Sequence, residues 1–186
     1  MQEKENVLRI LEETKIALKN NDAFRLKELS NQTIHTASMS QDSDNIAVAV
    51  IVYSLSKIIE RTEYKTLSGW NSFYRAILAY VDNLILALRK NQNSQFKEGL
   101  KYIRNAVSNL SGNLKFYIQD VFRKAEINKA SKIYEHGISM EKTAHLLGIT
   151  MFELASYAGQ KQEMGVPLGQ TLDVKSRIKI AEDIFK

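Results

Sequence analysis

The chain of 186 residues contains one proline and eight glycines, and this scarcity of helix-breaking residues most constrains its fold. Proline and glycine interrupt helices and shape the tight turns between strands. A chain with so few of them, and rich in Ala, Leu, Lys and Glu, favours long helices over sheet. We therefore predict an all-α protein.

Apolar residues recur at intervals of three and four along most of the chain, as they do on one face of a helix. The segment Ile46–Tyr53 is ambiguous, because its Val and Ile content would also suit a buried strand. We favour a helix there, since the apolar run continues to Ile59 and no partner strand is visible. The spacing predicts helices over about 2–20, 22–38, 46–59, 70–88 and from 94 onward, and a further one from Leu114 or Asp120 to His136.

The segment Ser111–Asn113 interrupts a regular apolar stripe that runs from Phe96 to Val121. One long helix or two helices in a hairpin would both keep the phase of this stripe, and we favour a break. We expect a bundle over residues 1–122 and a small module over residues 123–186. A last short helix is expected from Asp173 to Ile184.

Several classes of protein are disfavoured by composition. No cysteine is present, which excludes disulfides, thiolate metal sites and a cysteine nucleophile. The longest apolar-rich uncharged run, Asn45–Ser56, is shorter than the roughly 20 residues that cross a bilayer. The first twenty residues alternate charged and apolar positions, unlike a signal peptide. We expect a cytoplasmic protein without a membrane span and without a cofactor.

The segment Ser139–Ala158 has the pattern of a helix-turn-helix, the unit that places a helix in the DNA major groove. Ala144, Gly148 and Leu154 have its usual spacing: a small residue where the helices cross, a glycine in the turn, and an aliphatic residue in the shared core. Gly148 can take the positive φ that the turn requires.

Both helices of this unit have capping residues. Ser139 can cap the first helix, and Thr150 with Glu153 forms a capping box that predicts the start of the second. If the second helix reads DNA, its outward side chains contact bases, and nearby cations contact phosphates. The candidate DNA-binding residues are Thr150, Met151, Phe152, Ser156, Gln160, Lys161, Lys142, Arg123, Lys124, Lys129 and Lys132.

Charge does not decide between DNA and protein as the partner. The net charge of +5 permits contact with nucleic acid without implying it. Thr143–Gln160 contains no Lys or Arg, although phosphate neutralisation supplies much of the affinity for DNA. A helix-turn-helix that contacts protein, or a plain helical hairpin, are the alternative interpretations.

Residues 130–154 resemble small prokaryotic, often archaeal, helix-turn-helix proteins considered to be antitoxins of PIN-domain toxins. The similar features are an Ala-rich helix, Tyr134, the Gly-Ile-Ser at 137–139, the Leu-Gly turn at 147–148 and Gly165-Val166-Pro167. Alanine is usual in that family where this chain has Thr143. The resemblance implies a regulatory, antitoxin-like role in DNA binding.

No constellation of catalytic or metal-binding residues is found. His35 near Asp42 and Asp44, and His145 with Glu141, lack the further ligands of a metal site. No P-loop and no G-x-S-x-G motif occurs. We expect a non-enzymatic, homodimeric regulator that binds double-stranded DNA. A helical scaffold protein with a protein partner is the first alternative, and an enzyme with an unfamiliar helical fold is the second.

Overall fold

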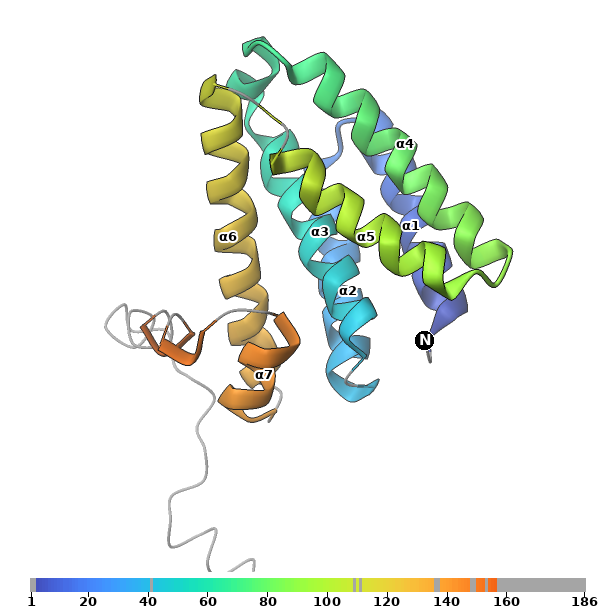
Figure 1. Cartoon of the computed structure of the whole chain (residues 1–186), viewed down its shortest axis with the longest axis vertical. Helices are drawn as coiled ribbons and strands as arrows, with labels where there is room; N and C mark the ends of the chain where they lie inside the picture. Colours follow the sequence, from blue (N-terminus) through green and yellow to red (C-terminus); the bar gives the residue numbers. More distant parts are fainter. Residues whose placement is uncertain are drawn as a thin grey trace, which may run out of the picture.

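The computed structural model describes residues 3–40, 42–108, 110, 112–135, 138–147, 150–152 and 154–156. These residues form helices and contain no strand, which confirms the all-α class (Figure 1). Residues 151, 152 and 154–156 are also helical. The elements are α1 (Lys4–Lys19), α2 (Ala23–Ser40), α3 (Ser43–Glu60), the 3-10 helix η1 (Thr62–Thr66), α4 (Trp70–Arg89), α5 (Asn93–Ser108), α6 (Gly112–Glu135) and α7 (Met140–Leu147).

Helix α3 lies at the centre of the bundle and packs against α1, α2, α5, α6 and α7. It contains the segment that could have been a strand, so the helix prediction is confirmed. Its side chains are buried on nearly all sides, from Ile46 and Val48 to Ile58 and Ile59. Helices on several sides therefore cover the Val- and Ile-rich residues. Asp42 caps this helix, since its carboxylate accepts the N–H of Asp44 at 2.9 Å.

Helices α5 and α6 are separate, which confirms the predicted break. Gly112, the first residue of α6, has a φ of +61°, a left-handed conformation that glycine adopts without the strain of a side chain. The apolar stripe is nevertheless buried on both sides of the break, at Phe96, Leu100 and Ile103 in α5 and at Leu114 and Ile118 in α6.

The main core is built from α1, α2, α3, α4, α5 and the first half of α6. Helix α4 contributes one continuous stripe to it, with every member buried as the spacing predicts. The stripe consists of Trp70, Phe73, Ile77, Val81, Leu84 and Leu88. This core holds together the part of the molecule that precedes α7.

A second core lies between α2, α3, the later half of α6 and the segment around α7. It contains Ile34, Ala37, Ile46, Ala49, Val50, Ala125, Ala130, Ile133, Ile138 and Leu154. Helix α6 runs without interruption across residues 122 and 123, between the expected bundle and the expected module. Residues from both segments thus share this second core.

Candidate functional site

Helix α7 begins as the capping pattern predicts. The Oγ of Ser139 accepts the backbone N–H of Lys142 at 3.2 Å, and the carbonyl of Ser139 accepts the N–H of Thr143 at 2.9 Å. Ala144 is 3% exposed, as expected for a small residue where two helices cross. Gly148 and Glu153, the residues expected to make the turn and the second cap, lie outside the described residues.

In the helical segment that follows Thr150, the first residues are exposed to solvent and one later residue is buried. Leu154 is fully buried in the second core, and its N–H donates to the carbonyl of Thr150 at 3.2 Å. Thr150 and Ser156 are exposed, and the exposed fractions of Met151 and Phe152 are 54% and 82%. Leu154 therefore anchors a segment whose N-terminal side chains are accessible.

The candidate phosphate-contacting cations are not all close to this segment. Lys142 is exposed on α7. Arg123 and Lys124 are exposed on α6, and about 18 Å of helix separates them from its end at Glu135. The carboxylate of Asp120 pairs with Lys124 at 2.7 Å. Gln160 and Lys161 lie outside the described residues.

Lys129 faces the interior, so its assignment as a phosphate contact is wrong for this arrangement. The side chain is fully buried, and its Nζ donates to the Oδ1 of Asn31 on α2 at 3.0 Å. The same Nζ lies 4.2 Å from the centre of the Tyr53 ring on α3. An ammonium group enclosed in this way cannot reach a DNA backbone.

Lys132, one turn further along α6, also turns toward α2. Its Nζ donates to the same Oδ1 of Asn31 at 3.2 Å, and the residue is half-buried. Two of the candidate cations are thus engaged within the bundle. Among the residues that the structure describes, neither Lys129 nor Lys132 forms an ion pair with a carboxylate.

The burial of Lys129 lowers its pKa from the ordinary value of 10.5 to about 7. Loss of hydration, which penalises the ammonium form, is the largest cause, and the positive charges of Lys132 and Lys27 add to it. The π-face of Tyr53 and the amide oxygen of Asn31 favour the charged form, but they do not offset the loss of water.

Lys27, Asn31 and Tyr53 were not predicted to take part in any site. Lys27 and Asn31 are four residues apart on α2, and Lys129 and Lys132 are three apart on α6, so each pair shares a helix face. The sequence contains both spacings, but it does not reveal that α2 and α6 pack against each other.

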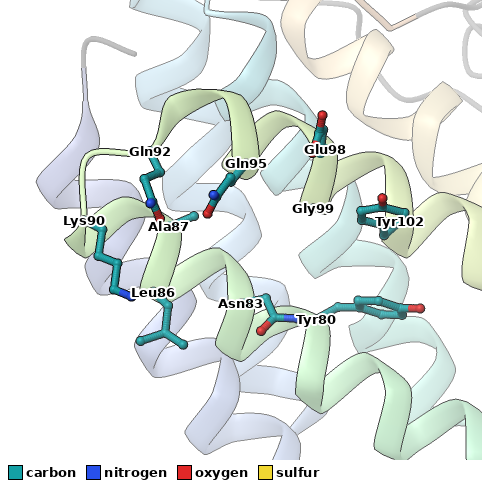
Figure 2. A pocket seen from close by; sticks show the side chains of 10 residues that line it. All are labelled: Tyr80, Asn83, Leu86, Ala87, Lys90, Gln92, Gln95, Glu98, Gly99 and Tyr102. Atoms are coloured by element: carbon teal, nitrogen blue, oxygen red, sulfur yellow. The ribbon is translucent and has the colours of Figure 1, made fainter.

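A groove of about 580 Å³ lies between α4 and α5 (Figure 2). Tyr80 and Tyr102 lie side by side at one end, with ring centres 6.4 Å apart and ring planes within 10° of parallel. The rest is lined by carboxamides, at Asn83 of α4, Gln95 of α5 and Gln92 of the loop between them, and by Leu86, Ala87, Lys90, Glu98 and Gly99. Such a lining suits hydrogen bonding and stacking, and it contains no histidine for acid–base chemistry.

Neither histidine pattern forms a metal cluster within the described part of the chain, where no group of three or more His, Asp or Glu side chains converges. Asp42 instead caps α3, and Asp44 lies 3.7 Å from Lys97. None of the described helices combines the length and apolar composition needed to cross a bilayer.

No family model, no curated protein and no solved structure matches the chain. The geometry of the described residues is therefore the basis for proposing a function.

Proposed function

We propose that this protein is a cytoplasmic, homodimeric DNA-binding regulator whose Thr150 segment contacts duplex DNA. One observation carries the proposal: Leu154 is buried while Thr150, Met151 and Phe152 are exposed. A recognition helix needs this arrangement, because its N-terminal residues must reach base edges while its other face is held. The likeness of residues 130–154 to antitoxin-like regulators supports the same function.

Lys129 and Lys132 donate to Asn31 within the bundle, which limits the number of lysines that can contact DNA phosphates. The remaining described candidates are Lys142, Arg123 and Lys124, all exposed. Each phosphate that a cation neutralises adds about −0.9 to the slope of log K against log salt. Three contacts per protomer thus predict a slope of about −3, and a dimer on two half-sites predicts about twice that value.

Fluorescence anisotropy of the full chain with a labelled random-sequence duplex would test the proposal at two salt concentrations. Reversing the charges of Lys142, Arg123 and Lys124 together should weaken binding and flatten the salt slope. Lys101→Glu is a matched control for one reversal, because Lys101 is exposed on α5. Absence of binding at low salt, or a slope that is flat with salt, would reject DNA binding.

A protein partner is the second candidate, and the exposed apolar side chains favour it. Phe152 is 82% exposed and Met151 is 54% exposed, and both lie within Thr143–Gln160, a segment without Lys or Arg. Side chains of this kind, central in an interface, are common anchors of protein binding. In this case the helix-turn-helix contacts protein instead of DNA.

Phe152→Ala separates the two candidates. For a DNA-binding helix, this change removes apolar contact with a base and leaves the phosphate contacts and the salt slope in place. If the segment instead joins two copies of this chain, sedimentation velocity should show a dimer for the wild type and a monomer for Phe152→Ala. If the variant remains a dimer and binds DNA in a salt-dependent way, the segment does not join two copies of the chain.

A further inference from the structure

Three lysines from two helices converge near one amide at the junction of α2, α3 and α6. The Nζ atoms of Lys129 and Lys132 both donate to the Oδ1 of Asn31, at 3.0 and 3.2 Å. The two ammonium groups therefore lie within about 6 Å of each other, where like charges repel. Lys27, one turn before Asn31 on α2, is close enough for its charge to act on Lys129.

One carboxylate stands near the outermost lysine of this junction: the hydrogen bond from Lys57 lowers the pKa of Glu60 on α3, and the charge of Lys27 adds to this effect. No ion pair within the described residues joins Lys129, Lys132 or Lys27 to a carboxylate. The oxygen of Asn31 carries only a partial charge, so it satisfies hydrogen-bond geometry without neutralising two cations. Buried cations are ordinarily paired with a negative charge. The excess of positive charge in this cluster therefore favours the binding of an anion.

The residues of the cluster differ in their exposure to solvent. Lys27 is exposed, Lys132 and Asn31 are half-buried, and Lys129 is fully buried behind them against the Tyr53 ring. An anion can thus meet Lys27 and Lys132 directly, while Lys129 adds positive potential from a region of low dielectric. Charge-assisted hydrogen bonds from lysine to phosphate oxygens are among the strong ones.

We propose that Lys27, Asn31, Lys129 and Lys132 form a binding site for a phosphate-bearing anion. A tetrahedral phosphate offers several oxygens, so it can accept from Lys132 and Lys27 at once and relieve the convergence of two cations on one amide oxygen. Lys132 lies within one turn of the end of α6, the helix that leads to α7. The site is distinct from the surface formed by Thr150, Met151 and Phe152.

Isothermal titration calorimetry of the full chain at pH 6, where Lys129 is protonated, and at matched ionic strength tests the site with two probes, inorganic phosphate and a nucleoside monophosphate. We expect saturable binding of both if the phosphate group alone is recognised, and of the nucleotide alone if a base is also required. Lys132→Gln should weaken binding about tenfold, the effect of losing one good charge-assisted contact. Lys101→Gln, a change of an exposed lysine on α5, should leave affinity unchanged.

A second variant keeps the test independent of folding defects. Lys129→Met removes the buried charge and should preserve the fold, because methionine fills a similar volume without a charge to bury. Phosphate should raise the melting temperature of the wild type more than that of Lys129→Met or Lys132→Gln. Absence of binding by either probe, or an equal response in wild type, Lys129→Met and Lys132→Gln, would overturn the proposal.

Discussion

The ammonium group of Lys129 lies 4.2 Å from the centre of the Tyr53 ring, and no part of the lysine is exposed to solvent. A cation over an aromatic face is stabilised, although by much less than the hydration that it gives up on burial. This contact joins α6 to α3 at the boundary of the second core, in which Tyr53 is a partly buried member. The protonation state of one lysine is therefore coupled to the stability of the fold.

We expect the free energy of unfolding to rise with pH above neutrality because of Lys129. Its pKa is about 7 in the folded state and near 10.5 in the unfolded state. Between these values the unfolded chain holds a proton that the folded lysine has released, so deprotonation favours folding as the pH rises. Below pH 7 both states hold the proton, and this group adds no slope. The full effect is on the order of 5 kcal/mol at most.

Urea denaturation of wild type and Lys129→Met between pH 6 and pH 9.5 measures this coupling. The variant should lose most of the slope above pH 7, and at pH 7 it should be about 1–3 kcal/mol more stable, as when a buried ion is replaced by an apolar side chain. Lys101→Met controls for the loss of one charge at an exposed position on α5. Equal slopes in wild type and Lys129→Met would contradict the assignment.

Leu154→Ala should loosen the attachment of the Thr150 segment to the bundle. Leu154 is fully buried in the second core, and truncating such a side chain to alanine costs about 2–5 kcal/mol. Leu154→Met keeps most of the volume and should cost less than about 1.5 kcal/mol. Chemical denaturation gives both values, and similar losses in the two variants would show that packing at this position does not depend on volume.

Thr143→Val should stabilise α7. Thr143 is fully buried, and its Oγ1 has no hydrogen-bond partner among the described residues. Valine replaces the hydroxyl with a methyl group of similar size, and removing an unsatisfied buried hydroxyl gains about 1 kcal/mol. The opposite sign is expected for Ser139→Ala, which removes the cap of the same helix. Thermal denaturation followed by circular dichroism would measure both, and a loss of stability in Thr143→Val would indicate an unrecognised partner of the hydroxyl.

Gly99→Ala should destabilise the contact between α4 and α5, although alanine is the better helix former by about 1 kcal/mol. A Cβ at this position would lie 2.6 Å from the Cδ2 of Leu84, which is itself buried. The double variant Gly99→Ala with Leu84→Val removes the clashing methyl group, so it should lose less than the sum of the two single changes. Strict additivity of the unfolding free energies would show that the close approach is not the reason for glycine here.

The fold class and the order of the helices follow from the sequence because they depend on local periodicity. The stripe from Trp70 to Leu88 was readable in this way. The break at Gly112 was indicated by the Ser111–Asn113 segment instead, because the apolar stripe keeps its phase across it. The assignment of Lys129 failed because a lysine on an otherwise polar stretch looks exposed. Its burial depends on Asn31 and Tyr53, which are remote in sequence and meet it only through tertiary packing. The spacing of Ala144 and Leu154 revealed two buried positions, but not that Leu154 would pack in a core shared with α2 and α3.

The composition of the second core affects how the chain folds during its synthesis. Ile34 and Ile46 emerge from the ribosome early, whereas Ile133 and Leu154, which belong to the same core, emerge about one hundred residues later. Until then an apolar surface on the first helices stays uncovered, and nascent chains with such a surface are prone to aggregate or to recruit chaperones. The later half of α6 and the segment of Leu154 thus complete the second core only after they have been synthesised.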